Sequence, residues 1–389
     1  MNYNFDQPID RRGTDCSKVD GLEKVFGRDD VLPLWVADME FRTPPFIMQA
    51  IRKRCDHEVF GYTFAGPQYY EAIQRWLLRK HRWTVETDWL MHVPGIVKGI
   101  AFAIQCFTQP GDKVVIQTPV YHPFRFAIDG LDRIVVNNPL RLDAAGRYHM
   151  DFESLEATFR SGGCKMLILC SPHNPGGVVW SKDTLQRLAS LCAHYGVLVL
   201  ADEIHGELVY LGTPHFPFAS VSGDARDNSI TFMSPSKTFN IPGIVTSYTV
   251  TPNDRIRRLW SRYLSVAGFG EGSVFSYVAT QAAYNHGDEW VSQLIDYIQG
   301  NVSWVISQLD ELLPAIKAYP PQASFLLWLD CRQMGLSHDA LRDLFVNTWR
   351  LGLNDGAMFG TEGEGFMRMN VGCPRPLLQE AMHRIRLSM

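Results

Sequence analysis

The feature of this sequence that most constrains its fold is a series of short, continuous apolar runs that alternates, from about residue 90, with amphipathic stretches. Continuous apolar character is typical of strands that are buried on both faces of a parallel sheet. The amphipathic stretches predict helices that cover such a sheet. The predicted strands are residues 113–117, 166–169, 197–200, 230–233 and 245–250. We therefore predict an α/β fold with a mainly parallel sheet.

Helix signals lie between and after these strands. In one helix, apolar residues recur at helical spacing between Ser181, a suitable N-cap, and Gly196, a suitable stop. A longer apolar stripe over residues 290–312 predicts a helix that ends before Pro314. The predicted elements beyond it are strands at 324–329 and 366–371 and a helix at 338–351. This order differs from the preceding sheet and predicts a second, smaller α+β domain.

The charge balance and the apolar runs narrow the range of partners. Lys and Arg number 37 against 41 Asp and Glu, a formal charge of −4, which is far from the basic balance of nucleic-acid-binding surfaces. No apolar stretch approaches the roughly 18 residues that span a bilayer, and the N-terminus lacks a basic segment followed by an apolar run. We expect a cytoplasmic protein without nucleic-acid or membrane partners.

Three polar clusters begin where predicted strands end, at residues 171–177, 201–205 and 234–239. Ligands of open α/β sheets bind outside the carboxyl ends of the strands, so these clusters should converge on one crevice. A Lys, a carboxylate and an Asn at one site suit a metal, a phosphate or a pyridine-aldehyde cofactor, which needs a Lys for a Schiff base and an Asp at its ring nitrogen. The motifs of zinc proteases, P-loops, nucleophile elbows and Rossmann sites are absent from the sequence.

At these residues the sequence resembles the class I/II aminotransferase superfamily of fold type I, whose members depend on pyridoxal 5′-phosphate (PLP). The shared combination is Ser-x-Ser-Lys at 234–237, Asn-Pro-Gly at 174–176 and Asp-Glu at 202–203, in the order and spacing of that family. A closer similarity is to its branch of cystathionine β-lyases and cystalysin-like cysteine C–S lyases. The segments that carry it are 34–41, 118–121, 170–175, 202–205, 236–240 and 370–375.

The resemblance covers essentially the whole chain and implies a specific architecture. The large domain would contain a mainly parallel, seven-stranded sheet and span residues 49–285. The smaller α+β domain would combine residues 1–48 with residues 286–389.

The resemblance also implies roles around the cofactor, with Lys237, Asp202 and Tyr121 as the catalytic residues. Lys237 would hold PLP as a Schiff base and move the Cα proton, and Asp202 would pair with the pyridinium nitrogen. Tyr121 would stack on the ring, and Asn174 would bind the phenolate oxygen. His205 stands where many aminotransferases carry a Tyr on that oxygen. The alternatives are a surface Lys, a helix-capping Asp, a core aromatic and an ordinary buried His.

The cofactor phosphate would bind at a Gly-led turn. Backbone N–H groups of Ile96 and Val97, after Gly95, open an apolar helix over 97–107, and the Ser234 hydroxyl would add a further donor. Lys98 would add charge there, or it is a solvated Lys.

Further residues concern the substrate and a second copy of the chain. Arg368 would hold the substrate α-carboxylate together with Asn174, a task that suits a planar bidentate fork, and Arg375 competes for this role. Tyr62 resembles the Tyr that reaches across a dimer to the neighbour's phosphate. We therefore expect a homodimer with shared active sites.

Two positions depart from the family pattern. Many aminotransferases carry an Arg eight residues after the Schiff-base Lys, where this chain has Val245. The branch reads Glu-Gly-Thr/Ser-Tyr before the strand near residue 325, whereas this chain has Gln-Ala-Ser-Phe at 322–325. The phosphate should therefore depend more on amides and hydroxyls, and side-chain preference is expected to differ if the loop contacts substrate.

The resemblance implies a PLP-dependent carbon–sulfur β-lyase. It would cleave L-cystathionine or related L-cysteine S-conjugates to a thiol, pyruvate and ammonia. An L-amino-acid aminotransferase is the first alternative, because the same residues serve both reactions through loss of the Cα proton. The second alternative is a protein that regulates a partner through a surface patch and retains PLP as a structural ligand.

Overall fold

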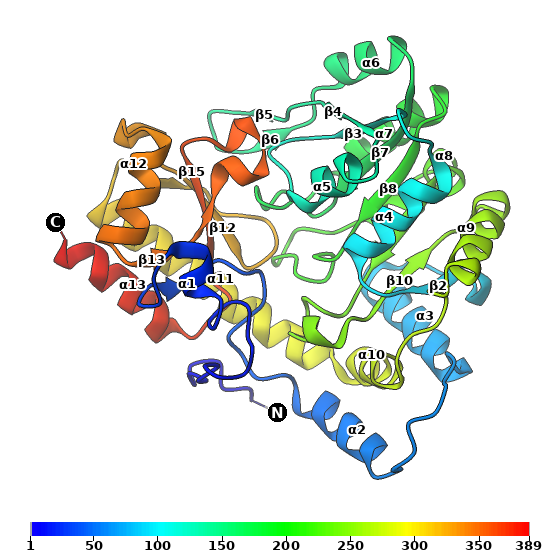
Figure 1. Cartoon of the computed structure of the whole chain (residues 1–389), viewed down its shortest axis with the longest axis horizontal. Helices are drawn as coiled ribbons and strands as arrows, with labels where there is room; N and C mark the ends of the chain where they lie inside the picture. Colours follow the sequence, from blue (N-terminus) through cyan, green and yellow to red (C-terminus); the bar gives the residue numbers. More distant parts are fainter. Residues whose placement is uncertain (1, 389) are drawn as a thin grey trace.

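The central element of the fold is a seven-stranded sheet, as seen in a computed structural model that describes residues 2–388 (Figure 1). Its order is β2-β10-β9-β8-β7-β3-β4, in which only β10 runs antiparallel to its neighbours. The strands are β2 (Leu90–Val93), β3 (Lys113–Ile116), β4 (Ile134–Asn137), β7 (Cys164–Cys170), β8 (Leu198–Asp202), β9 (Ser229–Met233) and β10 (Ser247–Val250). The predicted α/β fold with a mainly parallel, seven-stranded sheet is confirmed.

Helices cover both faces of this sheet, which explains the continuous apolar runs. The α-helices are α1 (Leu22–Phe26), α2 (Pro45–Cys55), α3 (Pro67–His81), α4 (Ile96–Phe107), α5 (Pro123–Asp129), α6 (Phe152–Arg160), α7 (Lys182–His194), α8 (Gly223–Asp227), α9 (Asp254–Val266), α10 (Val274–His286), α11 (Asp288–Leu312), α12 (His338–Asp343) and α13 (Arg375–Leu387). In β7, Met166 and Ile168 pack in one core cluster with α4, α5 and α9. Leu167 and Leu169 pack in another with α6, α7 and α8. Because successive side chains of a strand point to opposite faces, a strand covered on both sides must be apolar throughout.

The predicted helix ends agree with the structure. The Ser181 hydroxyl accepts a hydrogen bond from the backbone N–H of Thr184 at 3.1 Å, which caps α7. Gly196 follows that helix with a φ of 65°, a conformation that favours glycine. The long helix α11 stops at Leu312, two residues before Pro314.

A smaller antiparallel sheet follows α11, in the order β11-β12-β15-β14. Its strands are β11 (Lys317–Ala318), β12 (Leu326–Asp330), β14 (Asn354–Asp355) and β15 (Phe366–Asn370). The predicted helix over 338–351 is wrong in its second half, because α12 ends at Asp343 and a π-helical turn occupies Leu344–Thr348. The chain then leaves the helix because β13 (Leu351–Gly352) pairs in parallel with β1 (Leu32–Pro33), a contact that local sequence does not encode.

The N-terminal segment joins this second part of the molecule. Besides the pairing of β1 with β13, the backbone N–H of Asn370 donates to the carbonyl of Leu34, and that of Glu40 donates to Gly372. Figure 1 shows the N-terminal segment beside the orange and red C-terminal elements, with α11 passing between them and α10. The domain boundaries at residues 48/49 and 285/286 stay a prediction. Two further short strands, β5 (Arg141–Leu142) and β6 (Tyr148–His149), form a separate antiparallel pair.

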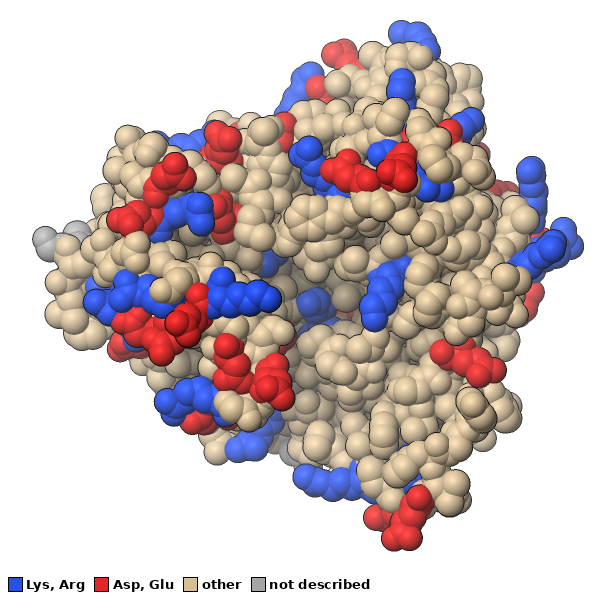
Figure 2. Space-filling model, viewed as in Figure 1, with Lys and Arg blue, Asp and Glu red and all other residues tan. Residues whose placement is uncertain are grey.

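The face of the molecule in Figure 2 carries acidic and basic side chains side by side, without a field of one sign. This face is hollowed between the part that holds α1 and α12 and the part that holds the seven-stranded sheet (Figures 1 and 2). None of the helices within residues 2–388 has the length and apolar character needed to cross a bilayer.

Candidate active site

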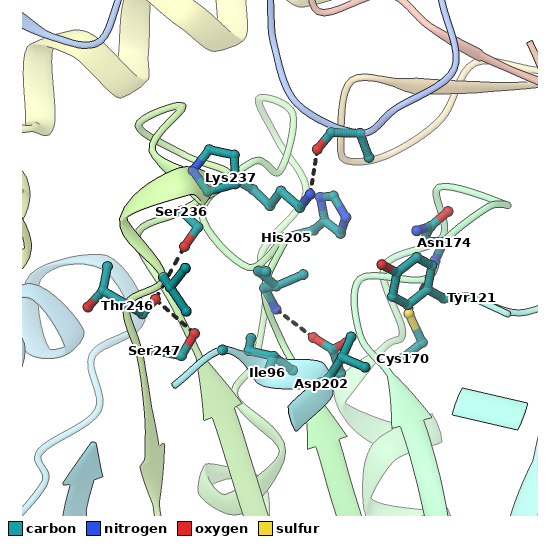
Figure 3. A pocket seen from close by; sticks show the side chains of 16 residues that line it. Ile96, Tyr121, Cys170, Asn174, Asp202, His205, Ser236, Lys237, Thr246 and Ser247 are labelled. Carbon is teal, nitrogen blue, oxygen red and sulfur yellow. Dashed lines mark hydrogen bonds between the residues drawn. The ribbon is translucent and has the colours of Figure 1, made fainter. Parts of the chain in front are cut away.

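The three polar clusters that follow β7, β8 and β9 meet at one cavity (Figure 3). Asn174 comes from the first cluster, Asp202 and His205 from the second, and Lys237 from the third. The other lining residues are Ala37, Gly95, Ile96, Val97, Tyr121, Cys170, Ile204, Ser236, Pro242, Val245, Thr246 and Ser247. The predicted convergence at the carboxyl ends of the strands is therefore confirmed.

Lys237 presents its amine inside this cavity rather than on the surface. The amine donates a hydrogen bond to the backbone carbonyl of Ala37, on the N-terminal segment. Burial lowers the pKa of Lys237 to about 8, helped by repulsion from Arg368 and opposed by the carboxylates of Asp38 and Asp202. An amine with this pKa is substantially neutral near pH 8, and a neutral amine is the form that attacks a carbonyl.

Asp202, the last residue of β8, lies at the base of the cavity next to the sheet (Figure 3). Its Oδ1 accepts a hydrogen bond from the backbone N–H of Ile204 at 3.1 Å. Burial raises the pKa of this carboxyl to about 7, although the hydrogen bond and the charge of Lys237 oppose the shift. No α-helix begins at residue 203 in the described chain, so Asp202 is not a helix cap. A buried carboxylate of this kind favours a cationic or protonated ligand beside it.

Arg368, on β15, is buried within a set of neutral acceptors. Its Nη1 donates to Asn174 Oδ1 at 2.9 Å, and its Nη2 donates to Asn354 Oδ1 at 2.5 Å and to the carbonyl of Trp35 at 3.2 Å. The guanidinium also lies 4.8 Å from the centre of the Phe359 ring. Its Nε is buried without a hydrogen-bond partner among the described residues. Burial lowers the pKa of Arg368 to about 10, so the side chain stays cationic at neutral pH and lacks an anion.

Two further predicted residues flank the cavity. Burial raises the pKa of the Tyr121 phenol, so its hydroxyl is neutral, and Figure 3 shows the ring beside Asn174 and Cys170. Burial lowers the pKa of His205 to about 3, reinforced by the positive charges of Lys237 and Arg368. The neutral His205 ring lies beside the Lys237 side chain (Figure 3), and its Nδ1 has no hydrogen-bond partner within residues 2–388.

The departure at residues 322–325 contacts the site through its last residue. The Phe325 ring lies edge-on to the His205 ring, with centroids 5.9 Å apart. Ser324 has a φ of 75°, and Gln322 Oε1 accepts a hydrogen bond from the backbone N–H of Val179 at 3.1 Å. The loop therefore shapes the site by packing against His205.

One end of the cavity is built to receive an anion. Gly95 has a φ of 101°, which a residue with a side chain adopts only under strain, and it directs the chain into α4. Ile96 and Val97 line the cavity at the start of that helix, where backbone N–H groups are free of helical partners. The hydroxyls of Ser236 and Ser247 lie at the same cavity (Figure 3).

Not every residue predicted for the phosphate lies in this cavity. The Ser234 hydroxyl is buried outside its lining, whereas Ser236, two residues on, lines the cavity; both hydroxyls donate to the carbonyl of Thr246, at 2.6 Å and 3.2 Å. Lys98 is exposed and is not part of the lining. Val245 does line the cavity. Its φ of 53° is not that of a strand, so β10 begins at Ser247 rather than at residue 245, the predicted start.

Two residues predicted for substrate and dimer contacts lie elsewhere. Arg375 donates to Asn301 Oδ1 at 2.7 Å and lies 5.2 Å from the centre of the Trp304 ring, outside the cavity lining. Tyr62 is fully exposed on the segment between α2 and α3. The cavity of this one chain therefore contains neither residue.

Sequence reasoning missed a cluster of charges behind Lys237. Arg11 contacts Asp38 at 2.7 Å and Glu40 at 2.8 Å, and Lys18 contacts Glu40 at 2.8 Å and Asp38 at 3.4 Å. Lys18 has a fully buried side chain, and no local pattern in the sequence marks it. The cluster fixes the segment whose Ala37 carbonyl accepts the hydrogen bond from Lys237.

The alternative of a metal site has no matching ligand group. Among residues 2–388, no set of three or more His, Cys, Asp or Glu side chains is arranged to hold a metal ion. The charged groups of the cavity are instead one amine, one carboxyl and, beside Asn174, one guanidinium.

Comparisons with known proteins agree on one family. The sequence model described as "Aminotransferase class I and II" matches residues 29–385. Cystathionine beta-lyase PatB of Bacillus subtilis (strain 168) is 40% identical over 386 residues, which cover 99% of this chain and 100% of that protein. The crystal structure of cystalysin from Treponema denticola, which contains PLP, has a TM-score of 0.96 and 32% identity over 100% of this chain and 99% of its own. The PLP-bound C–S lyase from Staphylococcus hominis has a TM-score of 0.93 and 31% identity over 100% and 98%.

Proposed function

Because the chain belongs to the aminotransferase class I and II family, we propose that it is a PLP-dependent carbon–sulfur β-lyase. Its substrates would be L-cystathionine or related L-cysteine S-conjugates. With L-cystathionine and water, the products are L-homocysteine, pyruvate and ammonia. The observation that carries the proposal is one cavity that joins the amine of Lys237 to the carboxyl of Asp202, with the guanidinium of Arg368 beside it. The lyase activity in the names of similar proteins supports elimination as the outcome.

The residues of the cavity fit PLP, the cofactor named for the similar structures. The amine of Lys237 suits covalent binding of an aldehyde, and the buried carboxyl of Asp202 suits a protonated ring nitrogen. The start of α4, together with Ser236 and Ser247, suits the phosphate. When bound, PLP supplies an electron sink that stabilises the negative charge left at Cα after proton loss.

The chain's own groups then divide the work as follows. Arg368, held by Asn174 at 2.9 Å, would bind the substrate α-carboxylate and orient Cα. The amine of Lys237 would remove the Cα proton, since its lowered pKa makes the neutral base available near neutral pH. Asp202 would keep the ring nitrogen protonated, and its burial strengthens that interaction.

We further propose that two copies of the chain share their active sites. Four exposed aromatic or aliphatic side chains support this arrangement, because they stand close together in the sequence between α2 and α3. They are Val59, Phe60, Tyr62 and Phe64, with 66%, 55%, 108% and 77% exposure. Sedimentation of the wild type as a dimer, and weaker PLP retention in Tyr62→Ala, are the expected results.

The function is tested by adding L-cystathionine to the PLP-loaded protein with and without a 2-oxo acid. A β-lyase releases homocysteine and pyruvate in equal amounts without the oxo acid. Amino-group transfer that appears only with the oxo acid would identify an aminotransferase instead. Lys237→Ala is the control, and it should be inactive in both assays.

A further inference from the structure

A second cavity adjoins the candidate active site, and the steps above do not use it. Ala37, Lys237 and Pro242 line both cavities, so the two meet where the Lys237 amine lies. The second cavity has a volume of about 770 Å³, within the range of about 300–1,000 Å³ typical of small-molecule sites. It therefore has room for the group attached to the β-carbon of a substrate whose Cα lies at Lys237.

Two arginines of this second cavity have no counter-charge. Arg42 and Arg52 both line it, from the segment before α2 and from α2 itself, and both are exposed. Neither forms an ion pair with any carboxylate in residues 2–388. The Nε of Arg42 donates to the neutral amide oxygen of Gln7 at 3.5 Å. Their guanidinium groups are thus available to a carboxylate, which they bind through paired N–H donors.

The acidic residues of the same cavity are already occupied. Asp38 and Glu40 line it, but each is bound by Arg11 and by Lys18. This cluster of two anions and two cations is neutral as a whole. Apart from Lys237, which the proposed function assigns to the cofactor, the charge that the cavity offers to a ligand is consequently positive and comes from Arg42 and Arg52.

We propose that this cavity receives the departing group of the substrate and that Arg42 and Arg52 select S-conjugates whose departing thiol carries a carboxylate. The inference rests on the proposed β-lyase function and defines the substrate class of that site. L-Cystathionine belongs to this class, because its departing homocysteine has a carboxylate. S-Ethyl-L-cysteine does not, because its departing ethanethiol has no charge.

A third cavity provides a matched control. It touches the active site at Tyr121 and is lined by a single arginine, Arg125. That side chain is 3.3 Å from Asp129, one helical turn along α5, and Glu364 lines the same cavity. The third cavity thus lacks the surplus positive charge, although it also adjoins the active site.

The test compares three substrates with the PLP-loaded, full-length protein: L-cystathionine, S-(2-carboxyethyl)-L-cysteine and S-ethyl-L-cysteine. In the double variant Arg42→Gln/Arg52→Gln, kcat/KM for the two carboxylate-bearing substrates should fall about five- to tenfold, which corresponds to roughly two exposed ion pairs, one for each arginine. For S-ethyl-L-cysteine it should stay within about twofold of the wild type. Arg125→Gln should change none of the three values.

The wild-type preference should also shrink at about 1 M salt, where the screening length falls to about 3 Å. Equal losses for all three substrates in the double variant would overturn the proposed subsite, as would a selective loss in Arg125→Gln. Cleavage of S-ethyl-L-cysteine by the wild type keeps the two proposals separable. If the enzyme cleaves that substrate but the arginines do not discriminate, the β-lyase stands and the subsite fails.

Discussion

We expect the Arg368→Gln variant to lose affinity for substrate while it keeps its fold. Arg368 is 3% exposed, and its hydrogen-bond acceptors are two amide oxygens, on Asn174 and Asn354, and one backbone carbonyl, on Trp35. No Asp or Glu among residues 2–388 forms an ion pair with it. The substrate carboxylate would supply the missing anion. Because the variant lacks the guanidinium that binds this carboxylate, its KM should rise.

The size of the effect follows from the burial of this cation. Removing one partner of a buried, hydrogen-bonded charge pair costs about 2–5 kcal/mol in binding. At about 1.4 kcal/mol per factor of ten, kcat/KM should fall at least about 30-fold and up to several thousand-fold. The loss of three hydrogen bonds to buried acceptors is offset by the removal of an unpaired buried charge, so the melting temperature should not drop by more than a few degrees. These two effects separate a binding role from a structural one.

Steady-state kinetics with S-ethyl-L-cysteine measure this change, since that substrate has only the α-carboxylate. Arg375→Gln is the matched control, because Arg375 is held by Asn301 outside the cavity and should leave KM unchanged. Arg368→Lys should recover part of the loss, since it keeps the charge without the planar fork. A KM for Arg368→Gln within about threefold of the wild type, together with a raised KM for Arg375→Gln, would refute the reasoning.

Three further changes test other parts of the molecule. Lys237→Ala should abolish turnover and covalent PLP retention, measured by absorbance after gel filtration. The pKa of Asp202 in the folded protein is about 7, above its ordinary value of 3.8. The stability that Asp202 contributes to the cofactor-free protein is therefore lost as pH rises from about 4 through 7. Asp202→Asn should flatten this pH dependence, measured by urea unfolding at several pH values. Trp76→Phe removes the indole donor to buried Glu207 and should lower the free energy of unfolding by about 1–3 kcal/mol, measured by urea titration.

The parts of the fold that sequence predicts are those set by local patterns. The strands were predictable because β7 and its neighbours are covered on both faces, which forces continuous apolar runs. The α7 cap at Ser181 needs only residues three positions apart. The end of the helical region predicted over 338–351 was not predictable in the same way, because Leu351 pairs with Leu32, more than 300 residues earlier.

The site shows the same division. Asn174, Asp202 and Lys237 follow strand ends, so a topological rule brings them to one cavity. The choice of Ser236 over Ser234 is not encoded locally, because both hydroxyls donate to the carbonyl of Thr246, at 3.2 Å and 2.6 Å, and only the folded structure shows that Ser236 lines the cavity. The contact of Lys237 with Ala37 joins residues 200 positions apart and requires the three-dimensional structure.

The most direct test of the central claim counts turnovers in the absence of any 2-oxo acid. The PLP-loaded protein is given excess S-ethyl-L-cysteine, and ethanethiol, pyruvate and ammonia are measured against the concentration of active sites. A β-lyase regenerates its active site each cycle, so we predict equal amounts of the three products, continuing far beyond one equivalent per site. Amino-group transfer that stops at one equivalent, without thiol release, would contradict the account.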